Sequence, residues 1–271
     1  MQAGLTRTCF PLCHLQKMVN MSRLGKISHS QVSHSNMLVW GGSGVLGRAI
    51  ARKFAEHGWS VGIHYHNNRL SAEKTRATIQ QGDKNVRLYQ ANVHEPSQIT
   101  QLFQEFLQDY GTLHLLIWAV GIAPSKLLTK TTPEIWQNTL QTNLTGAFHV
   151  LKTAGLIFER QRHGTVILVG SLSGEQGMPG QAAYAASKAG LMGLMQTTAQ
   201  EWGNWNIQVN AIFPGWHSSP LSEPRIDSAI QRQPHLLHRT PSLDQMTASV
   251  YHLASTQDVS GQIWNLDSRI W

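Results

Sequence analysis

Residues 37–50 read MLVWGGSGVLGRAI, an apolar run followed by closely spaced glycines and then by an amphipathic segment. The glycines are Gly41, Gly42, Gly44 and Gly47. Small residues at a strand-to-helix turn let the chain reverse sharply and let backbone N–H groups approach a phosphate at the positive end of the helix. The stretch therefore predicts a βα unit whose turn binds the pyrophosphate of a nucleotide.

Further apolar runs of strand length follow the first one, and amphipathic segments separate them. The expected strands are 37–40, 60–65, 86–91, 113–120, 165–170, 207–213 and 262–266, and the clearest helices are 45–58, 95–111 and 181–203. Most of these runs are apolar on both faces, which is typical of parallel strands covered by helices on each side. Repeated strand–helix alternation predicts an α/β fold: a Rossmann-type doubly wound parallel sheet of about seven strands in three α/β/α layers.

The N-terminal residues differ from the rest of the chain. Of the net charge of +7, more than half lies in residues 1–36, which contain basic but no acidic side chains. We expect this segment to be a disordered basic tail, or an over-extended reading frame with the true start at Met18 or Met21. Residues 37–271 are expected to form one domain, since a chain of this length can bury a sizeable core without a second one.

Composition excludes several functions. No apolar stretch reaches the roughly 20 residues of a membrane-spanning helix, and the tail lacks the apolar core of a secretion signal. We expect no membrane association and a cytoplasmic protein, with organellar import through the basic tail left open. The mild positive surplus of the body does not predict nucleic-acid binding. Cys9, Cys13 and His14 lack a fourth ligand, so no metal site is expected.

The stretch 169–193, VGSLSGEQGMPGQAAYAASKAGLMG, predicts the chemistry. Tyr184 and Lys188 lie one helical turn apart on the same face, and Ser171 follows the strand expected at 165–170. A tyrosine, with a usual pKa of about 10, needs a nearby cation to exchange protons at neutral pH, and Lys188 supplies one. Ser171 can donate to a carbonyl oxygen on which charge develops. The arrangement suits interconversion of a ketone and an alcohol, with Tyr184 as acid or base.

These motifs resemble the short-chain dehydrogenase/reductase family, and the resemblance runs from Met37 to the end of the chain. It implies a catalytic set of Ser171, Tyr184, Lys188 and Asn143. In the family the lysine also holds the nicotinamide ribose, and the asparagine anchors a proton-relay water. For Asn143 a buried amide that bends its helix is the alternative reading, and the two roles are compatible.

The resemblance also implies a nicotinamide dinucleotide cofactor. Its expected contacts are Gly41, Ser43, Gly44, Val45, Leu46, Gly47, His66, Asn67, Asn92, Val93, Ala119, Gly121, Tyr184, Lys188, Pro214, Gly215 and Ser219. The end of the second strand, HYHNNRL at 64–70, lacks the acidic residue that NAD-preferring members place there. It offers His66, Asn67 and Arg69 instead, which together with Arg48 suit a 2′-phosphate, so NADP(H) is favoured over NAD(H).

The chain departs from the family pattern at the first two motifs. Trp40 stands where the family's first turn has threonine, and Val45 replaces the middle glycine. The family's NNAG after the fourth strand is Trp118-Ala119-Val120-Gly121 here. Because the two losses fall on neighbouring strands, we expect the Trp40 and Trp118 rings to pack together in place of a polar contact. Near the chain end, Ser268 and Arg269 replace the two glycines of the family's DGG.

Three functions are compatible with these residues. The leading one is reduction of a ketone, most like the 3-oxoacyl-acyl-carrier-protein reductases, with a small-molecule carbonyl substrate that an acyl-carrier protein can carry. The alternatives are a dehydrogenase of an alcohol, sugar or steroid, and a catalytically silent nucleotide-binding regulator. The proline-rich stretch 218–241 is either a substrate lid or an ordinary surface excursion. The family further implies a homo-oligomer, a tetramer or a dimer.

Overall fold

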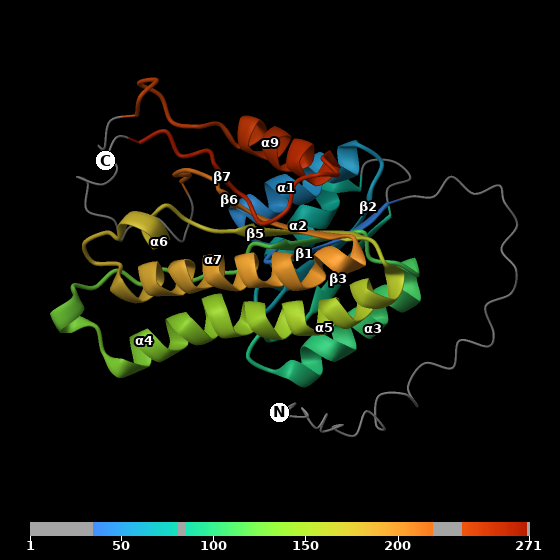
Figure 1. Cartoon of the computed structure of the whole chain (residues 1–271), viewed down its shortest axis with the longest axis horizontal. Helices are drawn as coiled ribbons and strands as arrows, with labels where there is room; N and C mark the ends of the chain where they lie inside the picture. The colour runs from blue at the N-terminus through green and yellow to red at the C-terminus, as the bar shows by residue number, and fades with distance from the viewer. Residues whose placement is uncertain (1–34, 81–84, 219–234, 270–271) are drawn as a thin grey trace, which may run out of the picture. The chain divides into compact units, whose positions relative to one another are not determined.

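The computed structural model describes residues 35–80, 85–218 and 235–269 (Figure 1). Seven strands form one parallel sheet in the order β3-β2-β1-β4-β5-β6-β7. The strands are β1 (Asn36–Trp40), β2 (Ser60–Tyr65), β3 (Val86–Gln90), β4 (Leu115–Trp118), β5 (Gly164–Val169), β6 (Ile207–Phe213) and β7 (Ile263–Asn265). The predicted doubly wound fold is confirmed, and each expected run contains a strand.

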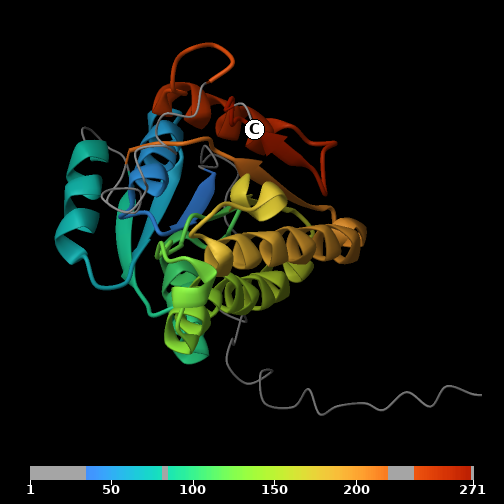
Figure 2. The same ribbon diagram turned by 90° about the vertical axis from the view of Figure 1, so that its left-hand side faces the viewer.

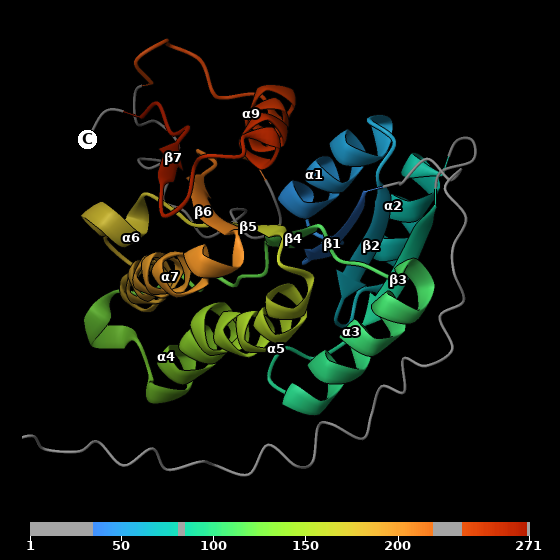
Figure 3. The same ribbon diagram turned by 45° about the vertical axis from the view of Figure 1, so that its right-hand side comes forward.

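Helices cover both faces of this sheet, as Figure 3 shows with the strands crossing between the two layers. The helices are α1 (Val45–Glu56), α2 (Arg69–Ile79), α3 (Pro96–Tyr110), α4 (Pro133–Leu140), α5 (Gly146–Gln161), α6 (Ser173–Gln176), α7 (Ala182–Trp202) and α9 (Leu243–Ser255). One core joins the sheet to α1, α2 and α9, and the other joins it to α3, α5 and α7. None of the described helices is long and apolar enough to cross a membrane.

Side-chain alternation along β1 explains the two cores. Met37 and Val39 point toward α1 and α9, whereas Leu38 and Trp40 point toward α3 and α5. All four side chains are fully buried. A strand of this kind reads as a continuous apolar run because both of its faces are covered.

Glycines end two of the predicted helices and not the third. Gly58 and Gly111 adopt φ values of +82° and +77°, which only glycine accepts without strain. Gly203 has a φ of −54°, and the chain continues through a 3₁₀ turn, Gly203–Trp205, to Asn206 at φ 60°. The left-handed residue that ends α7 is therefore an asparagine, whose short polar side chain tolerates this conformation.

The sheet reverses its winding between β1 and β4. From β1 the chain moves outward through β2 to β3, and from β4 it moves the other way through β5, β6 and β7. A doubly wound sheet opens a crevice at this point, beyond the carboxyl ends of its strands. Most of the predicted site residues follow those strand ends, whereas Asn143, Tyr184 and Lys188 lie in helical segments. Residues 1–34, Ser219 and most of the stretch 218–241 lie outside the described residues.

Candidate active site

A cavity of about 450 Å³ lies at the carboxyl ends of the central strands. Its wall contains these residues of the predicted site: Ser43, Gly44, Val45, Leu46, Gly47, Ala119, Gly121, Ser171, Tyr184, Lys188, Pro214 and Gly215. The glycine turn and the Ser–Tyr–Lys residues, which are more than 120 positions apart in the sequence, thus share one space.

The glycine turn is shaped by contacts that leave no room for side chains. Gly41 has a φ of +80°, and a Cβ there would lie 2.8 Å from the backbone of Ala119. A Cβ on Gly47 would overlap the carbonyl oxygen of Gly41. The N–H of Gly44 donates to that oxygen at 3.0 Å. Gly41 does not line the cavity itself, but its conformation sets the turn that does.

His64 ties the glycine turn to the neighbouring strands. Its Nδ1 accepts from the N–H of Gly41 at 3.1 Å, and its Nε2 lies 3.0 Å from the carbonyl oxygen of Ala91. Burial lowers the pKa of His64 to about 4, so the ring is neutral at physiological pH and Nε2–H donates to Ala91. The imidazole also stacks on Trp40, with ring centroids 4.3 Å apart. This role was not predictable from the sequence, because both backbone partners belong to other elements.

Trp40 and Trp118 pack together as predicted. Their ring centroids are 6.3 Å apart at an interplanar angle of 37°, and both rings belong to the core beneath α3 and α5. Phe103 lies against Trp40 on the same side, at 5.8 Å. Neither indole N–H has a hydrogen-bond partner among the described residues. The pair therefore acts through packing alone, in the range of separations that aromatic pairs prefer.

The Ser–Tyr–Lys residues come from two neighbouring elements. Tyr184 and Lys188 lie on α7, and Ser171 lies in the loop between β5 and α6, where its Oγ accepts from the N–H of Ser173 at 3.2 Å. Figure 2 shows the short α6 seated on α7. Lys188 Nζ donates to the carbonyl oxygen of Val169 at 2.8 Å and lies 5.7 Å from the Tyr184 ring centroid.

The pKa of Tyr184 differs in direction from the expectation that Lys188 makes the phenol more acidic. Burial lowers the pKa of Lys188 to about 8. Burial also raises the pKa of Tyr184 above its usual value, and the hydrogen bond of Ser171 and the charge of Arg269 lower it in part. The phenol is thus less acidic than a neighbouring lysine alone would make it, because the loss of hydration of the tyrosinate outweighs the favourable contacts.

Asn143 lies beneath the cavity floor and not in its wall. It sits in a π-helical turn, η3 (Gln141–Thr145), and is fully buried. Its Oδ1 accepts from the N–H of Ile122 at 2.8 Å, and its Nδ2 donates to Ile122 O and to Ser187 Oγ, each at 2.9 Å. A Cβ on Gly121 would lie 3.5 Å from Asn143 Oδ1 and 3.6 Å from Lys188 Nζ. The Asn143 amide therefore holds the backbone of Ile122 in place. The adjacent Gly121, which lines the cavity, lies close to both Asn143 and Lys188.

Several residues that we expected at the nucleotide end of the cavity do not line it. His66 and Asn67 are exposed and do not line it, and neither do Asn92 and Val93. Asn92 Oδ1 accepts from the N–H of His94 at 3.1 Å.

Arg48, Asn68 and Ser71 line this end instead. The Arg48 guanidinium donates to Ser71 Oγ at 2.8 Å and to Thr75 Oγ1 at 3.0 Å. Asn68 caps α2 by accepting from the N–H of Ser71 at 2.9 Å. The N-terminus of α2, which carries a partial positive charge, and the Arg48 guanidinium both lie at this end of the cavity. No acidic residue lies among the described residues that form it.

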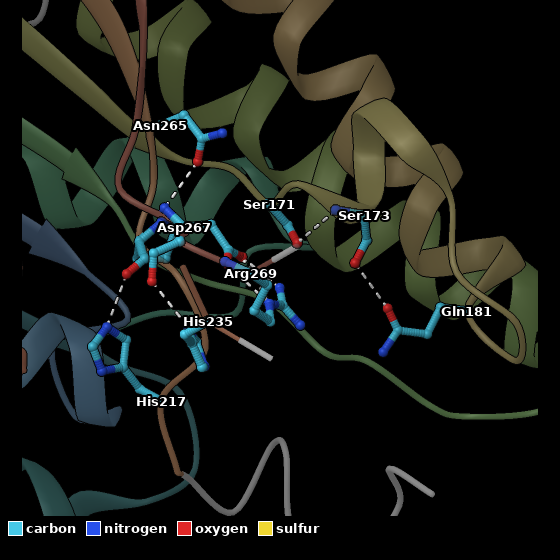
Figure 4. A network of polar contacts seen from close by, with 10 residues as sticks. Ser171, Ser173, Gln181, His217, His235, Asn265, Asp267 and Arg269 are labelled. Atoms are coloured by element: carbon cyan, nitrogen blue, oxygen red, sulfur yellow. Dashed lines mark hydrogen bonds and ion pairs between the residues drawn. The ribbon is translucent and has the colours of Figure 1, made fainter. Parts of the chain in front are cut away.

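The opposite end carries polar residues that sequence reasoning missed. They are Ser173, Gln181, His217, Asp267 and Arg269, accompanied by Met178 and Trp216. Figure 4 shows how several of these side chains converge from the loop after β5, the segment after β6 and the segment after β7. The single signal in the sequence was the replacement of a family glycine by Arg269. Burial lowers the pKa of His217, which also hydrogen-bonds Pro214 O at 2.9 Å.

The residues present fit a nicotinamide dinucleotide. The glycine turn and the Arg48 guanidinium lie at one end of the cavity. The Tyr184 phenol and Lys188 lie at the other end. Trp216 Nε1 is a buried donor in the cavity wall with no acceptor among the described residues. An unpaired buried donor of this kind costs free energy unless a ligand accepts from it.

Comparison with known proteins agrees with this assignment. The family model described as short chain dehydrogenase matches residues 35–229. The 3-oxoacyl-[acyl-carrier-protein] reductase FabG of Staphylococcus aureus is 34% identical over 69% of this chain and 76% of its own length. The FabG of Thermotoga maritima is 30% identical over 85% of this chain and 95% of its own length.

A solved structure shows the same architecture. A dehydrogenase/reductase from Sinorhizobium meliloti superposes with a TM-score of 0.80 at 27% identity, covering 88% of this chain and 96% of that one. With the family model matching most of the sequence and the fold and cavity in agreement, the chain belongs to the short-chain dehydrogenase family and is an oxidoreductase that uses NAD(P).

Proposed function

We propose that this oxidoreductase reduces a ketone to a secondary alcohol with NADPH, and that Tyr184 donates the proton. The observation that carries the proposal is the shared cavity: Ser171, Tyr184 and Lys188 line the same space as the glycine turn. A silent regulator would not need a buried lysine whose charged form is costly to maintain. The intact set therefore favours catalysis over binding alone.

Each of these residues has a distinct task in the proposed reaction. A bound nicotinamide supplies the hydride, and the chain supplies the rest. The hydroxyl of Ser171 donates to the substrate oxygen and orients the carbonyl beside the phenol. Tyr184 then gives its proton to the developing alkoxide, and in the reverse direction it removes that proton. Lys188 Nζ is held in position by its hydrogen bond to Val169 O. The protonated lysine therefore places a positive charge near the Tyr184 ring.

Preference for NADP(H) is supported by the nucleotide end of the cavity. Arg48 and Ser71 lie side by side there, linked by a hydrogen bond of 2.8 Å. A guanidinium and the N-terminus of α2 both favour a phosphate, and a ribose 2′-hydroxyl would lack the carboxylate that usually accepts from it. Of the residues expected to hold the phosphate, this assignment keeps Arg48 and adds Ser71. It leaves out His66 and Asn67, and also Arg69, which pairs with Glu73 at 2.9 Å outside the cavity wall.

The proposed substrate is a 3-oxoacyl thioester, which an acyl-carrier protein can carry. The relatives named as 3-oxoacyl-[acyl-carrier-protein] reductases, at 30–34% identity, support this choice. A second candidate is a small polar alcohol or ketone, such as a sugar. It is favoured by the polar side chains of Ser173, Gln181 and Asp267 in the cavity wall. The two candidates differ in the polarity of the group next to the carbonyl.

A substrate comparison tests the proposal. Consumption of NADPH is followed with acetoacetyl-CoA, as a soluble 3-oxoacyl thioester, and with a hydroxylated ketone of similar size. We expect turnover of the thioester, with a kcat/KM at least about tenfold above that of the polar ketone, a difference of about 1.4 kcal/mol. The reverse preference supports the second candidate. NADPH binding without turnover of either compound would support a silent regulator.

Homo-oligomer formation is also proposed. On α5, Phe148 and Leu156 are 45% and 46% exposed, and Trp136 on α4 is 36% exposed. Exposed apolar side chains on neighbouring helices are typical of a protein–protein contact. Light scattering of the purified chain distinguishes a monomer from a dimer or tetramer. We also propose that residues 37–271 form a single domain and that the protein is cytoplasmic.

A further inference from the structure

The segment after β7 brings a buried ion pair to the substrate end of the cavity. Arg269 Nε donates to Asp267 Oδ1 at 2.9 Å, and Arg269 Nη2 pairs with Asp267 Oδ2. The side chains are only 7% and 2% exposed, respectively. Both residues line the cavity together with Ser171 and Tyr184. In Figure 4 the Arg269 guanidinium lies on the side of Asp267 that faces Ser171.

Hydrogen bonds on both sides fix the position of this ion pair. The backbone N–H of Asp267 donates to Asn265 Oδ1 at 2.9 Å, and the backbone N–H of Arg269 donates to Asp267 Oδ1 at 3.1 Å. Between them, Ser268 Oγ bonds His235 Nδ1 at 3.0 Å. The pair is therefore built into the wall, and its orientation does not depend on a bound substrate.

An ion pair with no net charge still has a direction. Its field favours negative charge near the guanidinium and disfavours it near the carboxylate. Burial raises the pKa of the Tyr184 phenol, and the charge of Arg269 opposes this rise in part. The guanidinium lines the same cavity as Tyr184 and lies on the Ser171 side of Asp267, so the positive end of the pair faces the catalytic end of the cavity.

The other groups near Tyr184 come from three elements. Ser171, in the loop after β5, hydrogen-bonds the phenol. Lys188, on α7, directs its Nζ to Val169 O, and its pKa is lowered by burial to about 8. From the segment after β6, His217 lines the same cavity, and its pKa is also lowered by burial. Above pH 8, in the range where a phenol ionises, both side chains become neutral, which increases the importance of a guanidinium that stays charged.

We propose that Arg269, held by Asp267, is a positioning residue of the catalytic site whose guanidinium stabilises the tyrosinate of Tyr184 and the alkoxide formed beside it. The reaction itself rests on the proposed function, but the effect on tyrosine ionisation needs no turnover. The proton balance is unchanged: the Tyr184 O–H bond breaks as the alkoxide gains its proton. The family motif has glycine at this position, so the device belongs to this chain's own sequence.

Ionisation of Tyr184 can be measured directly in the ligand-free protein. The chain has five tyrosines, so labelling them with carbon-13 at the ring carbon that bears oxygen gives few NMR signals. Tyr184→Phe identifies the signal, which is then titrated with pH in each variant. Where the protein unfolds before the titration ends, the ionised fraction is compared at the highest pH at which tryptophan fluorescence reports the folded state.

The variants separate the guanidinium from its partner. We expect Arg269→Gln to raise the Tyr184 midpoint by about 0.5–1 pH unit and Arg269→Lys to restore most of the difference. Arg269→Gln leaves the Asp267 carboxylate unpaired, so the double variant Asp267→Asn/Arg269→Gln is needed as well. Its midpoint should remain above that of the unmodified chain, since the positive end of the pair is lost.

A second arginine–aspartate pair provides the matched control. Arg87 pairs with Asp109 at 2.9 Å on the exposed end of β3, outside the cavity wall. Arg87→Gln should leave the titration of Tyr184 unchanged, because this pair acts on another tyrosine, Tyr89, whose hydroxyl donates to Asp109 at 2.7 Å. The proposal is overturned if Arg269→Gln leaves the Tyr184 midpoint where it was, or if the double variant restores it.

The kinetic consequence is measured separately. In the oxidation direction the rate rises with pH as Tyr184 ionises, so Arg269→Gln should shift that rise to higher pH by the same amount as the NMR midpoint. A shifted midpoint in a protein that turns over no alcohol would disprove the proposed function and leave the role of Arg269 intact. Turnover of the alcohol with an unshifted Tyr184 midpoint would support the proposed function and overturn the role proposed for Arg269.

Discussion

Lys188 Nζ lies 2.8 Å from the carbonyl oxygen of Val169 and 5.7 Å from the ring centroid of Tyr184. The ammonium is thus held by the end of β5 near the ring of the proposed proton donor. Its burial makes this position unfavourable for folding, since a charged lysine loses its hydration there. A group placed at such a cost is typical of a functional site.

Lys188→Met is expected to stabilise the fold and abolish activity. With a pKa lowered from 10.5 to about 8, the lysine is protonated more readily in the unfolded chain, which disfavours folding at neutral pH by about 3 kcal/mol. The bond to Val169 is lost, so a net gain of about 1–2 kcal/mol in the free energy of unfolding remains. Urea unfolding at pH 7 measures it. A less stable variant would contradict the account.

The same shift has a pH signature. Because the folded-state pKa lies below the unfolded one, the unfolded chain binds the extra proton between pH 8 and 10, and stability from this group rises with pH there. The stability advantage of Lys188→Met over the unmodified chain should therefore fall from pH 8 to 10 and change sign.

His64→Gln tests the imidazole that supports the glycine turn. The folded-state pKa of about 4 lies below the unfolded value of 6.5, so protonation of the unfolded chain lowers stability as pH falls through this window, by about 3 kcal/mol in total. Glutamine cannot titrate, so the variant should be less stable at pH 7 but lose less stability between pH 6.5 and 4. His252→Gln, an exposed histidine of α9, serves as the control. An acid-induced loss of equal size in His64→Gln would contradict the assignment.

Gly47→Ala should disrupt the glycine turn. The new Cβ would overlap the carbonyl oxygen of Gly41, which cannot move without displacing the turn. We expect a loss of about 1–3 kcal/mol in stability and at least a tenfold weaker affinity for NADPH, measured by fluorescence titration. Gly193→Ala is the control, because a Cβ on this exposed residue of α7 meets nothing within 4 Å. Unchanged NADPH affinity in Gly47→Ala would exclude the turn as the pyrophosphate site.

Arg48→Gln should reduce the preference for NADPH over NADH. A charge-assisted hydrogen bond contributes about 1.5–3 kcal/mol, so the ratio of the two kcat/KM values should fall by about 10- to 100-fold. Arg52→Gln is the matched control on the same helix, because Arg52 is half exposed and pairs with Glu56 and Asp244 instead. A ratio that stays unchanged in Arg48→Gln would show that another group holds the 2′-phosphate, or that NADH is the natural cofactor.

The fold was predictable from the sequence because its signals are local. The central strands are covered on both faces and read as apolar runs, as Leu115–Trp118 does. The four-residue spacing of Tyr184 and Lys188 identifies one helix face. The Trp40–Trp118 contact was predictable for a related reason, since parallel pairing of neighbouring strands sets the two residues side by side.

The rest of the site depends on contacts between distant segments. His64 supports Gly41 and Ala91 from another strand, and no spacing in the sequence reports a backbone partner. Arg269 lines the cavity from the segment after β7, the edge strand of the sheet, far in sequence from the glycine turn. The lining of the nucleotide end was not predictable for a similar reason: Ser71, at the start of α2, lines the cavity, whereas His66 is exposed and does not.

The central claim is that the Tyr184 phenol is the acid and base of the reaction, and Tyr184→Phe tests it most directly. The substitution removes one oxygen and leaves the ring, so NADPH affinity by fluorescence titration should stay within about twofold. The rate of ketone reduction should fall by at least about 10³-fold, within the range that acid–base catalysis contributes. Tyr251→Phe, on α9 and outside the cavity wall, should leave both values unchanged. Retention of most of the activity by Tyr184→Phe, with the cofactor bound as before, would contradict the account.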